Sequence, residues 1–444
     1  MHSLTFQHLL SASNSSPHAI LEALRSLDHA VYLYDNGTPF IACCAERYTV
    51  IQDDIIQTYQ AVSFNQYEVV APDLTINFTS KSTSDSTRFN GGFVGFISYD
   101  YAAQQQVHYR QRQQPAFFIG QFSTYLELNP QGWIFKSSDP QAKHIFQQIQ
   151  ALLDQFQDKS EFNLVSPCTA RWNKSAYQEA FSQVQEYIKA GDCYQINLTQ
   201  EFSAQAKGSV LATAEQFWQL TNAPYAGYLR VGEFELLSCS PELFIEFQSE
   251  RRIITKPIKG TMPRYIDPIL DEQSKQTLKN SEKDQVENVM IVDLLRNDLS
   301  VYAETGSVKT PKLFNIESFN QVHHMVSEVT ATLKAEMNPF AVLMSALPGG
   351  SITGAPKIRA MQIIDELEGA ARGAYCGSMG YFDADGTGSW NILIRSIQKY
   401  QQDVSLWAGG GVTIASVCEA EYQECFDKVS AMLDLLNRWY KPAL

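Results

Sequence analysis

Lys259 lies in a sequence context that would suit a nucleophilic lysine. It lies between Pro257 and Gly260 in the segment TKPIKGTMPR, at the end of an apolar β-prone stretch, so the backbone on both sides restricts its position. A lysine acts as a nucleophile only when its amine is neutral, and burial or a neighbouring cation such as Lys256 or Arg264 lowers the pKa toward that state. The alternatives are a solvated lysine that blunts a strand end and a lysine that binds an anion.

A glycine-rich turn leads into a predicted helix in the segment LPGGSITGAPKIRAMQIIDELEG. Pro356 suits the first helical position and Gly369 suits the end of the helix. The turn would direct backbone N–H groups and the positive end of the helix at an anion. A P-loop is excluded because Gly354 is followed by Ala355 and not by lysine. The segment therefore indicates a carboxylate ligand rather than a nucleotide, with a plain helix-capping loop as the alternative.

Carboxylates on two predicted helices form the third candidate group. In WAGGGVTIASVCEAEYQECFDKV, helical spacing puts Glu421, Glu424 and Lys428 on one face, after a triple-glycine turn. In NSEKDQVENVMIVDLLRNDLS, Glu287 lies among aliphatic side chains. A buried acid needs a partner, so Glu287 either pairs with Arg296 or another base, or joins the other glutamates around a hard cation. A solvated charged stripe is the alternative for the first helix.

The elements that must position these segments follow from the pattern of apolar residues. Short β-prone stretches fill residues 1 to about 136, and residues 140 to 156 have a helical pattern. We expect a linker over Asp158 to Pro167 and then an amphipathic helix that Gly191 ends. Strands follow at CYQINLTQEF, YAGYLRV, FELLSCS, LFIEF and RRIITKPIKG, without a regular alternation of strand and helix. This order predicts an α+β fold with antiparallel sheets rather than a doubly wound parallel sheet.

Composition excludes several classes of protein. The 444 residues carry 34 Lys+Arg and 48 Asp+Glu, a formal net charge of −14, which argues against a general nucleic-acid binder. No apolar run reaches the roughly 18 residues of a membrane-spanning helix, and the N-terminus lacks a signal-peptide pattern, so we expect a cytoplasmic protein. The 8 cysteines form no C-x-x-C pair, which disfavours zinc sites and a disulfide framework.

In their order along the chain, these segments resemble the chorismate-utilising enzyme family. The strings that carry the resemblance cover nearly all of residues 171–435: GDCYQINL (191–198), SPELF (240–244), PIKGTMPR (257–264), MIVDLLRNDL (290–299), VHHMVS (322–327), GGSITGAPK (349–357), RGAYCGSMGY (372–381) and EAEYQECFDKV (419–429). GGFVGFISYD (91–100) adds a looser match. The resemblance implies antiparallel β-sheets packed as a sandwich with helices outside, an N-terminal region over residues 1–165 and a chorismate-binding catalytic region over 171–435.

The resemblance also assigns roles to particular residues. Glu287, Glu421 and Glu424 match glutamates that bind magnesium, which would hold the ring carboxylate of the substrate. Glu242 in SPELF matches an acid/base carboxylate that would protonate the departing hydroxyl or accept a proton from the amine. The positions that match substrate-binding residues are Gln195, His324, Ser351, Tyr375, Arg395, Gly409, Gly410 and Lys428.

Lys259 and Gln195 indicate the branch of the family. In the branch that forms 4-amino-4-deoxychorismate, the lysine of PIKGT is thought to add to the ring before ammonia displaces it, whereas anthranilate-forming relatives typically carry alanine there. Relatives that add water carry a lysine where this chain has Gln195. The resemblance therefore implies amination of chorismate, feeding 4-aminobenzoate and folate. Anthranilate formation, in tryptophan biosynthesis, is the alternative, and a catalytically idle relative is a third hypothesis.

Partners follow from the same resemblance. Ammonia in this branch comes from glutamine through a separate glutamine amidotransferase subunit, and this chain contains no amidotransferase segment, so we expect a partner chain. Relatives also hold a tryptophan in the N-terminal region. Pro224 and Tyr225 match part of that pocket, whereas Asn36 stands where serine is often found. Asn36, Pro224 and Tyr225 are therefore the candidate tryptophan pocket.

Overall fold

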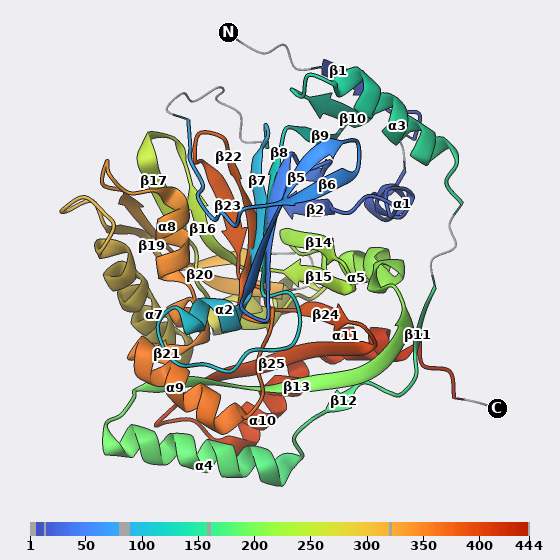
Figure 1. Ribbon diagram of the computed structural model, residues 1–444. Helices are drawn as coiled ribbons and strands as arrows, with labels where there is room; N and C mark the ends of the chain where they lie inside the picture. The colour runs from blue at the N-terminus through green and yellow to red at the C-terminus, as the bar shows by residue number, and fades with distance from the viewer. Residues whose placement is uncertain (1–5, 13–14, 80–88, 158–160, 319–321, 443–444) are drawn as a thin grey trace.

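The strands of the protein form two large sheets in a computed structural model that describes residues 6–12, 15–79, 89–157, 161–318 and 322–442 (Figure 1). The first sheet has 13 strands: β1 (Phe6–Leu9), β10 (Gly132–Ser137), β9 (Thr124–Asn129), β3 (Thr38–Cys43), β2 (Ala30–Asp35), β14 (Tyr225–Val231), β15 (Phe234–Ser240), β24 (Ser396–Tyr400), β25 (Asp403–Thr413), β13 (Gln195–Gly208) and β11 (Phe162–Leu164) in that order, with β12 (Thr169–Ala170) and β21 (Gly354–Ala355) also on β13. The second sheet has 12 strands: β18 (Ile258–Pro263), β20 (Val322–Thr332), β17 (Arg252–Thr255), β16 (Leu243–Phe247), β23 (Gly388–Asn391), β22 (Ser378–Asp383), β7 (Gly92–Ile97), β8 (Phe117–Phe122), β4 (Arg47–Gln52), β5 (Ile55–Ser63) and β6 (Gln66–Val70), with β19 (Lys309–Ser318) on β20. All these strand pairs are antiparallel, as the sequence predicts.

The two sheets pack face to face around a buried apolar core. Val31 of β2 and Leu236 of β15 come from the first sheet and join Val94 and Phe96 of β7 from the second. Alternate residues of each strand point into this layer. The sequence of these stretches shows the same two-residue alternation of apolar side chains. The sandwich of antiparallel sheets that the resemblance implied is confirmed.

Helices cover the outer faces of the sandwich. Their bounds are α1 (Pro17–Ala23), α2 (Tyr99–Gln104), α3 (Ala142–Asp154), α4 (Lys174–Ala190), α5 (Ala214–Thr221), α6 (Pro268–Lys279), α7 (Glu282–Ser300), α8 (Pro339–Ala346), α9 (Lys357–Glu368), α10 (Cys418–Asp427) and α11 (Ser430–Asn437), with a 3₁₀ turn η3 over Gly350–Ile352. Ile20 of α1, Ile149 of α3, Phe217 of α5 and Leu436 of α11 pack on the first sheet in one cluster. α4 follows the N-cap Asn173 and ends at Gly191, the end that its sequence predicts.

Strands from both halves of the chain share both sheets. β2 pairs with β14, aligning Tyr32 with Tyr228, and β7 pairs with β22, aligning Gly95 with Gly380. The expected linker is partly wrong, because β11 within it pairs with the end of β13 and buries Phe162 and Leu164. Residues 158–160 of that segment lie outside the described residues.

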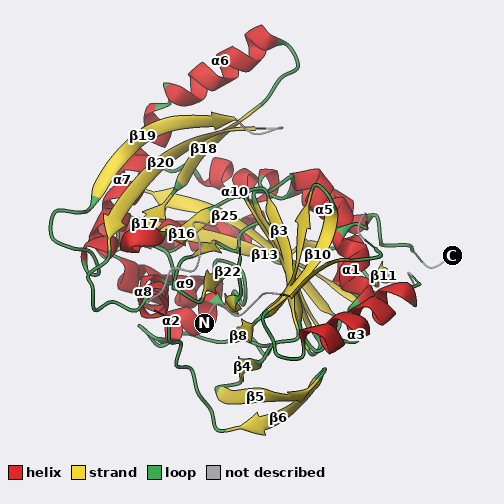
Figure 2. Cartoon of the chain, turned by 90° about the horizontal axis from the view of Figure 1, so that it is seen from above, coloured by secondary structure: helices red, strands yellow, loops and turns green. Residues whose placement is uncertain are grey.

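A three-stranded end of the second sheet projects from the body of the molecule together with α6 and α7. Figure 2 shows β18, β19 and β20 running outward, with α6 at the far tip. β20 pairs with β18 on one side and β19 on the other, and α6 and α7 pack on these strands. This projection carries Lys259 on β18 and Glu287 on α7.

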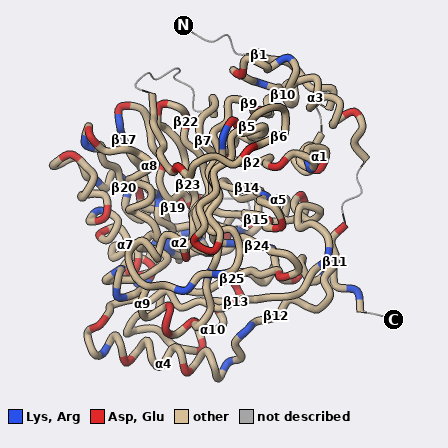
Figure 3. Tube along the Cα trace, viewed as in Figure 1, with Lys and Arg blue, Asp and Glu red and all other residues tan. Residues whose placement is uncertain are grey.

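Charged positions of both signs are scattered over most elements in Figure 3. Among the described residues, no helix is long and apolar enough to cross a membrane.

Candidate active site

Most of the predicted site residues meet at one cavity of about 500 Å³. The cavity lies where β18, β13 and β25 approach α7 and α10, and it takes residues from segments far apart in the sequence. The predicted residues that line it are Glu242, Lys259, Glu287, His324, Ser351, Tyr375, Arg395, Gly409, Gly410, Glu424 and Lys428. Such convergence of charged side chains on one concave surface marks the candidate active site.

Gln195 and Glu421 lie directly behind the cavity wall. The Gln195 amide packs so closely on Gly411 that a side chain at position 411 would clash with it. A Cβ at position 410 would lie 3.1 Å from Glu421 Oε2 and 3.0 Å from Glu424 Oε1, so both carboxylates point at the same glycine. The buried Oε1 of Gln195 has no hydrogen-bond partner.

A distortion of β18 presents Lys259 to the cavity. β18 pairs Lys259 with Met325 and Thr261 with His324, so the register shifts at Gly260 between them. Gly260 has φ +77°, and a Cβ there would lie 2.8 Å from Asp284 Cγ on α7, which explains the glycine. Thr261 Oγ1 and His324 Nδ1 lie 2.9 Å apart and fix the neighbouring ring.

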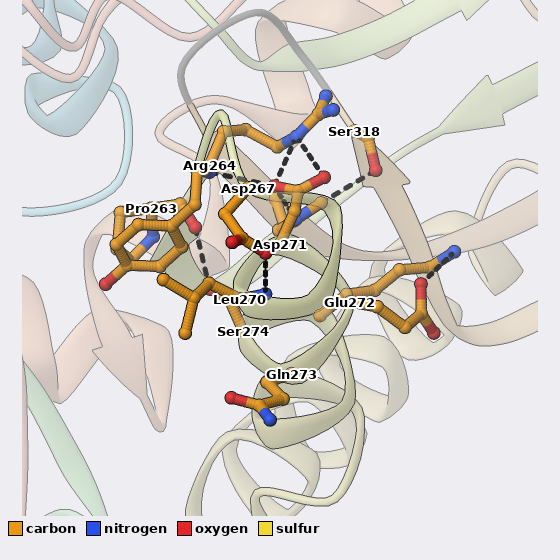
Figure 4. Close-up of polar contacts among 12 residues, drawn as sticks. Pro263, Arg264, Asp267, Leu270, Asp271, Glu272, Gln273, Ser274 and Ser318 are labelled. Atoms are coloured by element: carbon orange, nitrogen blue, oxygen red, sulfur yellow. Dashed lines mark hydrogen bonds and ion pairs between the residues drawn. The ribbon is translucent and has the colours of Figure 1, made fainter.

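The far end of β18 is fastened to α6. Figure 4 shows Arg264 pointing at Asp271, where Arg264 Nε donates to both carboxylate oxygens at 2.8 and 3.0 Å. The Ser274 hydroxyl donates to the carbonyl of Pro263 at 2.6 Å, and His323 Nε2 lies 3.1 Å from Asp271 Oδ1. These contacts fix the C-terminal end of β18, the strand that carries Lys259, against α6.

The surroundings of Lys259 favour a neutral amine. Burial lowers the pKa of Lys259, and the nearby Lys428 ammonium lowers it further, while Glu287 and Glu242 act in the opposite direction. The net direction is downward. The proposed nucleophile therefore has the electrostatic setting that its chemistry needs.

Glu242 also lines this cavity, and its pKa is raised whereas that of Lys259 is lowered. Its backbone is held by Ser240, whose hydroxyl accepts from Glu242 N at 3.2 Å and donates to Ile392 O at 2.6 Å. Burial raises the pKa of Glu242 to about 7, against the lowering effect of Lys259. A carboxyl group with this pKa can donate a proton near neutral pH.

The three glutamates predicted for magnesium lie around one end of the cavity. Glu287 comes from α7, whereas Glu421 and Glu424 come from α10. Burial raises the pKa of Glu287 and of Glu421. Burial also acts to raise the pKa of Glu424, but Lys428, Lys283 and Lys259 together lower it overall. Glu421 is buried and the other two glutamates are partly buried, and carboxylates of this kind suit a hard cation that screens their charge.

The glutamates are not gathered into a finished metal-binding geometry. Within the part of the chain that the structure describes, no group of three His, Cys, Asp or Glu side chains is close enough to hold a metal ion. Lys283 Nζ lies 4.0 Å from Glu287 Oε1 and lowers the pKa of all three glutamates, so it supplies positive charge among them. Arg296, the alternative partner for Glu287, pairs instead with Asp293 at 3.1 Å.

The triple glycine is a strand and not the turn that the sequence suggested. Gly409, Gly410 and Gly411 belong to β25 and pair with Thr199, Leu198 and Asn197 of β13, respectively. A Cβ at position 409 would lie 2.2 Å from Leu198 O. Side-chain-free positions therefore let the neighbouring strand and the α10 glutamates pack against the sheet.

Arg395 and Tyr375 also line the cavity. Arg395 has φ +51°, in the left-handed region, where its carbonyl accepts from Cys239 N at 3.1 Å. Burial lowers the pKa of Arg395, which remains a cation near neutral pH. The ring of Tyr375 stacks on Trp407 with centroids 5.9 Å apart. Burial and Arg395 together lower the pKa of His324 to about 4, so His324 is neutral at pH 7.

The cavity also contains residues that the sequence did not single out. Asn197, Thr261, Lys283 and Asp284 line it, together with Trp407. Asn197 and Thr261 lie inside the strings that carry the family resemblance, which is the signal that marks them. Lys283 and Asp284 sit in the first turn of α7, one helical turn before Glu287.

The candidate tryptophan residues lie together at a separate place. Asn36 N donates to the carbonyl of Pro224 at 2.7 Å, and Tyr225 lines a small cavity with Asp35 and Tyr381. That cavity measures only about 10 Å³, and in its lining Tyr381 Oη donates to Asp35 at 3.0 Å. This volume is that of about one water molecule.

Known proteins that resemble this chain share both its sequence and its fold. The model of the chorismate binding enzyme family matches residues 11–434. Aminodeoxychorismate synthase component 1 of Klebsiella aerogenes is 42% identical over 357 residues, covering 79% of this chain and 78% of the relative. The Escherichia coli K12 protein of that name is 38% identical over 90% of this chain and 87% of its own length. Anthranilate synthase component I from Streptococcus pneumoniae TIGR4, 24% identical, superposes with a TM-score of 0.76 over 89% of this chain and 92% of its own.

Proposed function

The chain belongs to the chorismate binding enzyme family, and we propose that it aminates chorismate with ammonia to give 4-amino-4-deoxychorismate, the precursor of 4-aminobenzoate in folate biosynthesis. The observation that carries this proposal is Lys259, a lysine of lowered pKa that faces the cavity beside an acid, Glu242, with a pKa of about 7. The relatives named aminodeoxychorismate synthase component 1 support the same branch.

In the first step the neutral Lys259 amine adds to the substrate ring. The nitrogen lone pair forms a C–N bond, the ring double bonds shift, and the bond to the ring hydroxyl breaks. Glu242 gives its proton to the departing oxygen, so the leaving group is water. The register shift of β18 next to Lys259 supports its role as the nucleophile, and the raised pKa of Glu242, about 7, supports its role as the acid.

In the second step ammonia adds to the ring and Lys259 leaves. A new C–N bond forms to ammonia, the ring double bonds shift back, and the electron pair of the older C–N bond returns to Lys259 Nζ. Glu242, now a carboxylate, accepts the proton that ammonia loses. The sum is chorismate plus ammonia to 4-amino-4-deoxychorismate plus water.

The two carboxylates of chorismate require positive charge at both ends of the cavity. Arg395 and Tyr375 suit the enolpyruvyl carboxylate, since a buried arginine forms two parallel hydrogen bonds with such a group. Glu287, Glu421 and Glu424 suit a magnesium ion, which when bound supplies positive charge for the ring carboxylate. Lys428 adds a second cation on this side.

Ammonia is proposed to come from a separate glutamine amidotransferase chain. The word "component" in the names of the relatives supports a second polypeptide.

The alternative is formation of anthranilate, which needs elimination of pyruvate and no lysine nucleophile. The experiment that separates the two supplies purified protein with chorismate, magnesium and an ammonium salt, and identifies the products by mass spectrometry. 4-Amino-4-deoxychorismate, converted to 4-aminobenzoate by an added lyase, is the expected product. Anthranilate without 4-aminobenzoate would reject the proposal.

A further inference from the structure

Arg372 and Glu368 form a fully buried ion pair behind one wall of the cavity. Arg372 Nη2 lies 2.7 Å from Glu368 Oε1 and Arg372 Nε lies 2.9 Å from Oε2, so the two side chains meet through two hydrogen bonds. Their side chains are 0% and 1% exposed. Burial of two charges is costly unless good geometry and further hydrogen bonds offset it, so the remaining contacts decide what the pair does.

The remaining hydrogen bonds of the pair reach two other segments. Arg372 Nη1 donates to Ile352 O at 3.0 Å, and Arg372 Nη2 donates to Asn197 O at 2.7 Å. Glu368 Oε1 accepts from Thr199 N at 2.9 Å and from Thr199 Oγ1 at 2.7 Å. The pair therefore ties β13, η3 and the segment after α9 to one another.

Each of these segments carries a residue of the cavity wall. Asn197 comes from β13, Ser351 from η3, and Tyr375 from the chain just after Arg372. The Arg372 guanidinium lies 5.8 Å from the centre of the Tyr375 ring. Gln398 fixes the same segment from the other side, since it accepts from Ala374 N at 2.8 Å. Arg372 and Glu368 themselves do not line the cavity.

We infer that Glu368 and Arg372 are a positioning pair for the substrate site. By fixing three segments to one another, the pair holds Asn197, Ser351 and Tyr375 in the arrangement that receives chorismate. The identity of that substrate rests on the proposed function. A planar guanidinium is required, because it serves two carbonyls and a carboxylate at once, which an ammonium cannot do in one plane.

Arg372→Lys tests the inference, because it keeps the charge and loses the planar fork. We expect the KM for chorismate to rise about tenfold or more, with a smaller change in kcat, since a displacement of about 1 Å in a positioning group is enough to cost binding and orientation. If the pair served stability alone, its loss would lower the folded fraction, and with it the apparent kcat, at unchanged KM.

Lys399→Met is the matched control, because Lys399 and Glu235 form another buried ion pair at 3.7 Å, away from the cavity. It should lower the thermal midpoint without raising KM.

Two further measurements decide the matter even if Arg372→Lys folds poorly. Thr199→Val removes one hydroxyl that donates to Glu368 and should raise the KM for chorismate about threefold, a change that a lower folded fraction alone would not produce. Hydrogen exchange should become faster over residues 349–356 and 372–377 in the Thr199→Val protein, but not in Lys399→Met. Unchanged KM and unchanged exchange in Thr199→Val would overturn the inference. Release of anthranilate by the wild-type protein would reject the proposed function, while the KM for chorismate would still test the pair.

Discussion

The Lys428 ammonium donates a hydrogen bond of 2.8 Å to the carbonyl oxygen of Gly409, and this contact holds a second cation in the cavity that contains Lys259. Lys428 also pairs with Glu424 at 2.6 Å, so it is fixed from two sides. Next to burial, its charge is the largest cause that lowers the pKa of Lys259. Lys428 therefore helps to keep the proposed nucleophile uncharged.

Replacing Lys428 with methionine should move the acid limb of the pH profile upward. Lys259 is active when neutral, so activity is lost as pH falls through its pKa. Loss of the Lys428 charge raises that pKa, and the limb follows to higher pH. Profiles of kcat at saturating chorismate and magnesium check this. Lys174→Met removes an exposed lysine paired with Glu419 and should leave the limb in place. An unmoved limb in Lys428→Met would contradict the electrostatic role.

Glu242→Gln should remove an alkaline limb from the profile. The acid form of Glu242 is the active one in the first step, so activity falls as pH rises through its pKa of about 7. Glutamine does not titrate, and kcat should fall by about 10²–10⁴-fold with no limb at that pH. Glu246→Gln, four residues further along the chain on β16, serves as the control and should retain the limb. A limb that persists in Glu242→Gln assigns it to another group.

Glu421→Gln should weaken the dependence on magnesium. Glu421 points with Glu424 at Gly410, and loss of one carboxylate lowers the affinity for a hard cation. We expect the magnesium concentration for half-maximal rate to rise at least about tenfold. Glu419→Gln on the same helix, at an exposed ion pair with Lys174, should behave as wild type. Full turnover of the wild-type protein in excess chelator would remove the magnesium role from all three glutamates.

Tryptophan at millimolar concentration should neither bind nor change the rate. The cavity that Tyr225 lines has a volume of about 10 Å³, far below that of an indole, and Tyr381 donates a hydrogen bond to Asp35 in its lining. Isothermal titration calorimetry and initial rates check this. Saturable binding that is lost in Tyr225→Ala would show that the cavity opens.

Much of the fold could be predicted because strong local patterns agree with it. Gly191 ends α4 in the structure as the sequence predicts, and the apolar stretches after Gly191 are strands. The triple glycine was misjudged, because glycine-rich segments usually turn, whereas here the absence of side chains serves close packing with Leu198 O and Glu424. That reason lies in contacts between distant segments, which local patterns do not contain.

Some features of the candidate site could likewise be predicted from the sequence, whereas others depend on contacts between distant segments. The strings of the family resemblance named Lys259 and Glu242, and the structure brings both to one cavity. The sequence could not show that Lys428 approaches Lys259, or that Lys283 lies among the glutamates, because helix–sheet packing decides these distances. Glu368 and Arg372, four residues apart, look like an ordinary surface pair in the sequence, and only their burial reveals the network.

A covalent intermediate on Lys259 is the most direct test of the account. Protein with saturating chorismate and magnesium, but without ammonia, is quenched in acid and measured by intact-protein mass spectrometry with peptide mapping. We predict a species heavier by chorismate less one water, located on Lys259, which disappears when ammonium is added and never forms in Lys259→Ala. An unmodified Lys259 in protein that converts chorismate at full rate once ammonia is present, or full activity of Lys259→Ala, would contradict the account.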